Sequence, residues 1–306
     1  MSLKRLDQED ITISVEAVTT SAWSGNTPEI TAFTRNNDQI NSTSGKFFHE
    51  VSSLGEVQFS IAYGNITGAG AVPFTADVTE NTPTSVTYKQ YRNLIFGTEE
   101  ESQGVEKKFK IGGVDSDEIL VINIDRSRYK EKLLPGSLEI NIGGTVYTDN
   151  SSTQTVQIFT DAGREFSIVD SGGTEVGKLY PDIGVLIFRP QSITVASSTT
   201  PGETLTNFFN AIVNGASFKL QSEETLSSNI VFIRARNAEF NYTTNPSIIT
   251  SDGEIRDPVL VNSPQTFITT VGLYNDRNEL LAVAKLSRPL LKDFTKEALL
   301  RIKLDF

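Results

Sequence analysis

The chain contains no cysteine among its 306 residues and only one histidine, His49. Without cysteine there are no disulfides, no thiolate metal sites and no cysteine nucleophile. A single histidine excludes histidine clusters within one subunit, so a Ser-His-Asp triad would depend on His49 alone. His49 follows Phe47 and Phe48, and the sequence contains no G-x-S-x-G nucleophile elbow. We therefore interpret His49 as a structural or surface residue.

Other local signals of function are also missing. No stretch approaches roughly 18 uninterrupted apolar residues, and the opening MSLKRLDQEDITISVEA has no apolar region of the length that a secretory signal needs. We expect a protein that is made and kept in the cytoplasm and has no membrane partner. No Walker-type phosphate loop and no strand-linked GxGxxG motif occurs, so a nucleotide site has no local support. We expect no cofactor and no catalysis.

Positive charge is scarce relative to negative charge. The 38 acidic and 27 basic residues give a formal net charge of −11. This balance repels nucleic acid over most of the surface, so we expect no nucleic-acid partner. Two acidic clusters, Glu99–Glu101 and Asp115–Glu118, lack the spacing of an EF-hand loop. We interpret them as solvated loops and expect no metal site.

Alternation with a period of two dominates what is present. Short runs rich in Thr, Val, Ile and Phe are bounded by Gly, Asn, Asp, Ser and Pro. This pattern predicts a mainly β protein with antiparallel, sandwich-like sheets, one or two short helices, and long loops or arms. The predicted strands are Ile11–Val18, Val57–Tyr63, Ile119–Ile124, Leu138–Ile142, Val156–Phe159, Phe166–Val169, Val185–Phe188, Phe218–Gln221 and Ile230–Ala235.

The clearest helix is predicted near residues 201–214. Thr200 is suited to cap it, Pro201 suits the first turn, and Glu203 completes a capping box. Gly215 then ends it, and the apolar residues between fall on one stripe. A second segment, Ser85–Ile95, is ambiguous between helix and other structure.

The chain divides on composition into three consecutive regions. Residues 1–97 form a polar, β-rich region, residues 98–113 a charged glycine-containing loop or linker, and residues 114–306 the main β domain. Within the first region, Gly25–Lys46 and Tyr63–Thr84 contain few continuous apolar runs. They are either arms that become ordered against neighbours or ordinary loops.

The C-terminal segment predicts a hairpin followed by a terminal strand. Residues 266–274 alternate, Asn275–Asn278 supplies turn residues, and an apolar run resumes at residue 279. In the strand 299–306, an apolar face alternates with Arg301, Lys303 and Asp305. The candidate interface residues are those of this face, together with the lone tryptophan, which we expect to anchor in a partner's pocket: Leu300, Ile302, Leu304, Phe306 and Trp23.

Three blocks of this sequence resemble a known family. They are NIVFIRARNAEFNYTTNPS at residues 229–247, RYKEKLLPGSLEINIGG at residues 128–144, and the C-terminal segment from residue 266 to residue 306. The family comprises virion structural proteins of contractile-tailed phages that infect marine cyanobacteria, and the similarity extends over most of the chain. It implies a part of the tail, baseplate or neck, with other virion proteins as partners. It offers no catalytic motif to carry over.

Two functions from different classes remain. The first is a virion structural protein, a homo-oligomer or ring within the particle, that assembles through sheet and arm contacts. The second is a host-surface carbohydrate-binding or fibre-like module, favoured by the loops rich in Asn, Thr and Ser. Fibre proteins usually show obvious repeats, and this sequence has none.

Overall fold

A computed structural model describes residues 4–38, 47–70, 82–97, 107–198 and 203–305, with side chains omitted for residues 35–38. The chain divides into two compact units. Unit 1 consists of residues 1–16 and 225–306, and unit 2 of residues 17–224. The two boundaries fall inside strands β1 (Ile11–Ser21) and β17 (Gln221–Ala235).

This division differs from the three consecutive regions that composition indicates. Strand β5 (Glu56–Asn65), from the first region, pairs with β8 (Glu118–Ile124), from the third, over the full length of β8. The segment between them is not a linker, since Phe109 and Ile111 are both 1% exposed in the same core. Residues 98–106 of the expected linker lie outside the described part.

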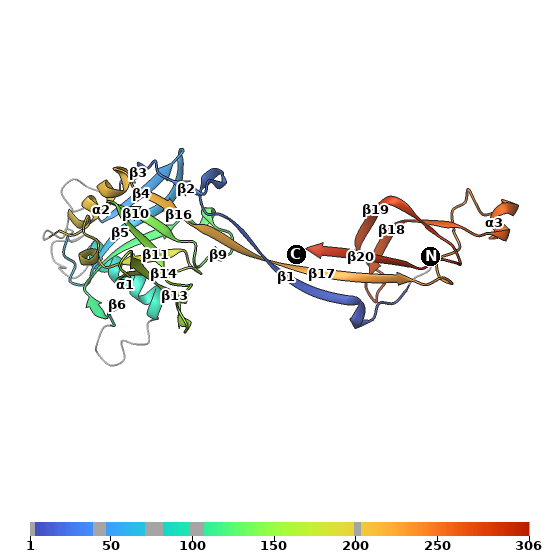
Figure 1. Cartoon of the computed structure of the whole chain (residues 1–306), viewed down its shortest axis with the longest axis horizontal. Helices are drawn as coiled ribbons and strands as arrows, with labels where there is room; N and C mark the ends of the chain where they lie inside the picture. The colour runs from blue at the N-terminus through green and yellow to red at the C-terminus, as the bar shows by residue number, and fades with distance from the viewer. Residues whose placement is uncertain (1–3, 39–46, 71–81, 98–106, 199–202, 306) are drawn as a thin grey trace. The chain divides into compact units, whose positions relative to one another are not determined.

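The structure confirms a mainly β protein built from antiparallel sheets. The largest sheet has 12 strands, belongs to unit 2 and curls almost into a barrel (Figure 1). Its order is β2-β16-β10-β11-β13-β14-β15-β8-β5-β4-β3, with β12 paired to β13. The remaining elements of unit 2 are β2 (Glu29–Ile30), β3 (Thr34–Asp38), β4 (Phe48–Ser53), α1 (Pro83–Phe96), β6 (Phe109–Ile111), β7 (Val114–Ser116), β9 (Lys132–Leu133), β10 (Glu139–Ile142), β11 (Thr145–Asp149), β12 (Ile158–Thr160), β13 (Gly163–Asp170), β14 (Glu175–Tyr180), β15 (Val185–Phe188), α2 (Thr204–Val213) and β16 (Ser217–Lys219).

Apolar side chains cover both faces of the central strands of this sheet. Along β8, Leu120 and Ile122 enter one cluster of buried residues, the first cluster, whereas Ile119 and Val121 enter a second. Helix α2 packs in the first cluster and α1 in the second. Because successive residues of a strand point to opposite faces, two covered faces require the continuous apolar run that β8 shows.

The helix predicted near residues 201–214 forms, and the ambiguous segment Ser85–Ile95 is also helical. The apolar stripe of α2 is buried through Leu205, Phe208 and Ile212. The expected cap at residues 200–202 lies outside the described part, and Glu203 makes no side-chain capping hydrogen bond. The ambiguous segment is α1, in which the side chain of Thr82 accepts a hydrogen bond from the Ser85 amide.

The described part of the first candidate arm packs on the core. Ile30 and Phe33 are 4% and 5% exposed and belong to the first cluster. An extended arm is therefore wrong for residues 25–34. Residues 39–46 and 71–81 of the two candidate arms lie outside the described part.

Unit 1 contains a small sheet and a separate hairpin. In the sheet, β17 pairs antiparallel with β20 (Ala298–Asp305), and β1 neighbours β17. The predicted hairpin is formed by β18 (Thr266–Tyr274) and β19 (Leu280–Lys292), joined through the expected turn at Asn275–Asn278. A short helix, α3 (Pro258–Asn262), precedes β18.

Candidate functional site

Unit 1 buries few apolar side chains among the described residues: Ile230, Val231, Ala235, Ala298 and Ile302. Neither cluster of buried apolar residues includes a residue of unit 1. Most of the large apolar side chains that are exposed in the described part of the chain belong to this smaller unit. They are Ile11, Ile13, Val15, Tyr242, Val259, Val261, Phe267, Tyr274, Leu280, Leu281, Val283, Phe294 and Leu299.

Three of these side chains form a row on β1, the apolar row of β1. Ile11, Ile13 and Val15 occupy alternate positions and therefore share one face of the strand. They are 42%, 69% and 66% exposed. No Lys, Arg or Pro interrupts β1, although such residues usually protect an edge strand from pairing with other chains.

A second exposed apolar row lies on the hairpin. Gly272 pairs with Val283 and Tyr274 pairs with Leu280, so these residues meet across the two strands. A Cβ at Gly272 would lie 3.0 Å from the Tyr274 ring and 3.2 Å from Leu280, which places both side chains over the glycine backbone. Tyr274, Leu280 and Val283 are exposed.

The predicted terminal strand is β20, and its alternation is as expected. Ile302 is 8% exposed and lies opposite Val231, while Leu300 and Leu304 are half-buried on the same face. The strand that pairs with β20 belongs to the same chain. In the order β1-β17-β20, the other edge of β20 pairs with no described strand. Phe306 lies outside the described part.

Charges differ between the two edges of this sheet. Arg301, Lys303 and Asp305 are exposed on β20, whereas Glu16 is the only charged residue of β1. Lys303 Nζ lies 3.8 Å from Glu16 Oε2, which places the two side chains on one face across β17. Arg301 forms no ion pair with any other described residue. Successive residues of a strand point to opposite faces, so the apolar row of β1 lies on the face opposite to Glu16 and Lys303. Ile302 of β20 also lies on that face.

Trp23 does not lie at the surface. It is 3% exposed in the first cluster, with its ring centroid 6.3 Å from those of Phe59 and Phe218. The expectation that Trp23 anchors in a partner's pocket is wrong, because these aromatic residues of its own chain already surround it. The polar neighbours that suggested exposure are turn residues next to the core.

The structure places His49 and one acidic cluster in structural positions. His49 is fully buried, with its ring 4.7 Å from that of Phe209. In the cluster 115–118, Asp117 forms an ion pair with Lys108 at 2.6 Å, and Glu118 accepts hydrogen bonds from Asn65 and Gln191. Residues 99–101 lie outside the described part. Among the described residues, no group of His, Asp and Glu has an arrangement suited to a metal ion.

A buried lysine fixes a loop in unit 1. Lys292 is 0% exposed, and its Nζ donates hydrogen bonds to the Asn237 carbonyl at 3.0 Å, to Asn241 Oδ1 at 2.8 Å and to the Asp293 carbonyl at 2.9 Å. All three ammonium protons are thus used. This arrangement joins the end of β19 to the loop after β17.

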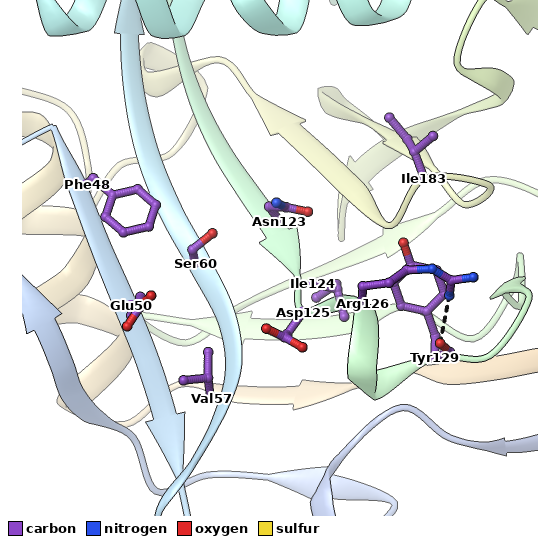
Figure 2. A pocket seen from close by; sticks show the side chains of 10 residues that line it. All are labelled: Phe48, Glu50, Val57, Ser60, Asn123, Ile124, Asp125, Arg126, Tyr129 and Ile183. Atoms are coloured by element: carbon purple, nitrogen blue, oxygen red, sulfur yellow. Dashed lines mark hydrogen bonds between the residues drawn. The ribbon is translucent and has the colours of Figure 1, made fainter.

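Unit 2 has a groove lined by polar side chains. It has a volume of about 310 Å3 and opens over β4, β5 and β8 (Figure 2). Glu50 pairs with Ser60, and Ser60 pairs with Asn123, so three polar side chains form a row across three adjacent strands. We call this the polar row of the groove.

Apolar and charged groups flank the polar row. Phe48 and Ile183 line the groove and pack against the second cluster. Beyond the row, the Arg126 guanidinium lies 4.5 Å from the centre of the Tyr129 ring and donates a 2.8 Å hydrogen bond to the Tyr129 carbonyl. Burial raises the pKa of the Tyr129 phenol, and the Asp125 carboxylate adds to that effect while Arg126 opposes it. Sequence patterns gave no sign of this site.

No described helix has the length and apolar character that crossing a membrane would require. Comparisons with family models, with curated proteins and with solved structures found no match to this chain.

Proposed function

We propose that the chain is a structural protein of the virion of a contractile-tailed phage, in the tail, baseplate or neck, and that unit 1 assembles it with further copies of itself. The resemblance of three sequence blocks supports the virion setting. The exposed apolar surface of unit 1 supports the assembly role. No catalysis is proposed.

The single observation that carries the proposal is the apolar row of β1. Single exposed apolar residues are common on soluble proteins, but contiguous apolar rows mark interaction sites. Here the row lies on an edge strand, whose unpaired backbone groups can accept another strand. A neighbouring chain at this edge would bury the apolar row and satisfy the backbone of β1.

The partner that fits this edge is β20 of a second copy. The edge formed by β20 carries Arg301, Lys303 and one acid, Asp305, whereas β1 carries Glu16 and is preceded by Glu9 and Asp10. Opposite charges favour a β1–β20 contact between copies over pairing of two identical edges. Because the two surfaces differ, the contact is head-to-tail, and it gives a ring if the rotation closes.

Light scattering on the purified chain at several concentrations tests the assembly role. The proposal expects the wild-type mass to rise to a defined oligomer, whereas Ile13→Asp stays at the mass of one chain. The introduced carboxylate would have to be buried at the contact, with a cost of several kcal/mol. We expect the Ile13→Asp variant to keep its fold, because the Ile13 side chain is 69% exposed.

Thr12→Asp is the matched control, because it puts the same charge on the neighbouring residue of β1, on the other face. It should still assemble. A wild-type chain that remains a monomer at every concentration contradicts self-assembly. The virion setting is tested separately by labelling purified particles with an antibody against the chain. Label on the tail, baseplate or neck supports it, and label on free protein alone contradicts it.

A further inference from the structure

We propose that the groove of unit 2 binds a neutral, hydroxyl-rich ligand, one or two sugar units, through the polar row formed by Glu50, Ser60 and Asn123. This site is independent of the assembly role and lies on other elements. It gives the chain a recognition function in addition to a structural one.

The polar row adjoins buried apolar residues of the same strands. The same face of β5 and β8 carries Ala62 and Val121, which are buried in the second cluster. Glu50, Ser60 and Asn123 are half-buried and line an open groove instead. Other polar residues of this face, such as Lys178, Glu165 and Ser167, pair with one another. The polar row instead lines a groove, which leaves its side chains accessible to a ligand.

Two members of the row have unused hydrogen-bonding capacity. Within the described part of the chain, neither the Ser60 hydroxyl nor the Asn123 amide forms a hydrogen bond. The nearby Asp125 uses its Oδ1 atom to accept from Ser127, at 2.9 Å from the amide, and its Oδ2 atom accepts no hydrogen bond from a described residue. Polar groups that face a cavity in this way can bind a ligand or water.

The chemistry of these groups matches hydroxyl groups. Carboxylates accept hydrogen bonds, an amide offers both a donor and an acceptor, and a serine hydroxyl does the same. A sugar hydroxyl also donates and accepts, so it can pair with each of them. Two carboxylates in the groove disfavour an anionic ligand, and the Arg126 guanidinium disfavours a cation.

The size of the groove also fits. Adjacent strands are about 4.8 Å apart, so a row across three strands extends over about 10 Å. The volume of about 310 Å3 is at the lower end of the usual range for ligand pockets, about 300–1,000 Å3. Phe48 provides an apolar side chain beside the row, against which the C–H face of a sugar ring can pack.

Saturation-transfer NMR on the full chain, with methyl glycosides of glucose, galactose, mannose and N-acetylglucosamine as probes, tests the proposal. We expect at least one glycoside to bind with a Kd of about 1–10 mM, and Asn123→Ala to weaken that binding at least tenfold. Ser60→Ala should weaken it less, because one hydroxyl is lost. The control is Gln154→Ala, which removes an amide elsewhere on unit 2.

The other outcomes contradict the proposal. If no glycoside binds the wild-type chain, the groove is not a sugar site. If binding is unchanged in Asn123→Ala, the sugar binds elsewhere. Binding of L-arginine amide in place of the glycosides would show that Glu50 and Asp125 recognise a cation instead. Retained native dispersion in the NMR spectrum of each variant shows that its fold is intact.

Discussion

At the scale of single residues, several side chains have roles that their neighbours in the sequence conceal. Trp23 lies among polar turn residues yet is buried in the first cluster. Lys292 ends an exposed hairpin strand yet is fully buried, because three carbonyl oxygens accept hydrogen bonds from its ammonium group. Neither position could be predicted from the sequence, since each depends on contacts with segments that are distant along the chain.

Leu54 is in a backbone conformation that leucine disfavours. The turn between β4 and β5 has two residues, Leu54 and Gly55, with φ of 54° and 80°. Positive φ at both positions is the type I′ pattern, which prefers Asn-Gly. Leu54→Asn should therefore raise the free energy of unfolding by about 1 kcal/mol and the Tm by about 2–4 °C.

The Tm of the full chain, measured by thermal unfolding, reports this effect. Leu54→Ala is the control, because it removes the apolar side chain, which is 77% exposed, but keeps a Cβ residue that disfavours positive φ. A rise in Tm that is equal in the two variants would contradict the backbone explanation.

We expect two buried tyrosines to make the folded chain less stable in alkali. Burial raises the pKa of Tyr63 and of Tyr180 far above the ordinary value of 10.0, and at Tyr180 the nearby Glu165 carboxylate adds to the effect. The unfolded chain then releases these protons near pH 10 while the folded chain keeps them. The free energy of unfolding is therefore unaffected by these groups below pH 10. Above pH 10 it falls by up to about 1.4 kcal/mol per pH unit for each tyrosine.

Urea unfolding at pH 8, 10 and 11 measures this loss. Tyr180→Phe should show a smaller fall between pH 10 and pH 11, because one titrating group is removed. Its stability at pH 8 should be lower, since Glu165 loses the 3.0 Å hydrogen bond that the Tyr180 hydroxyl donates. An unchanged alkaline slope would show that Tyr180 does not contribute to it.

At the scale of elements, the sequence predicted strands where alternation or a continuous apolar run marks burial, as in β5, β8, β10 and β15. It missed β14, where Gly177 interrupts the run and Lys178 is polar. The structure explains both residues: a Cβ at Gly177 would lie 2.5 Å from the Ile187 carbonyl, and Lys178 forms ion pairs with Glu165 and Glu175. Polar residues that are paired inside a fold give no apolar pattern.

The terminal strand supplies a test of the small sheet in unit 1. Ile302→Asp would place a carboxylate opposite Val231, which is 4% exposed. We expect a cost of about 3 kcal/mol or more. Hydrogen exchange should show faster exchange in β17 and β20, with unit 2 unaffected.

Leu299→Asp is the matched control on the same strand, because the side chain of Leu299 is 67% exposed. It should leave protection of β17 and β20 close to that of the wild type in dilute solution. If Ile302→Asp also leaves this protection unchanged, β20 is not packed as the structure shows.

At the scale of the whole molecule, the division into units could not be predicted from composition. Unit 1 joins the first 16 residues to the last 82, and unit 2 is the continuous segment between them. Pairing between strands that are distant in sequence, such as β5 with β8, decides which segments share a core. The groove has the same origin, because Glu50, Ser60 and Asn123 become neighbours only through strand register.

The distribution of apolar surface between the two units is the basis of the assembly proposal. Unit 2 contains both apolar clusters, whereas unit 1 carries most of the large apolar side chains that are exposed in the described part of the chain. A unit of this kind gains stability when a partner covers those side chains, so its stability should depend on protein concentration.

Hydrogen exchange of the backbone amides of Ile11–Glu16, measured over a range of protein concentrations, is the most direct test of this account. If a second copy pairs with β1, exchange at these amides should slow as the concentration rises, while amides in β8 exchange at a constant rate. If the amides of Ile11–Glu16 exchange equally fast at every concentration, β1 is not the assembly edge and the account is contradicted.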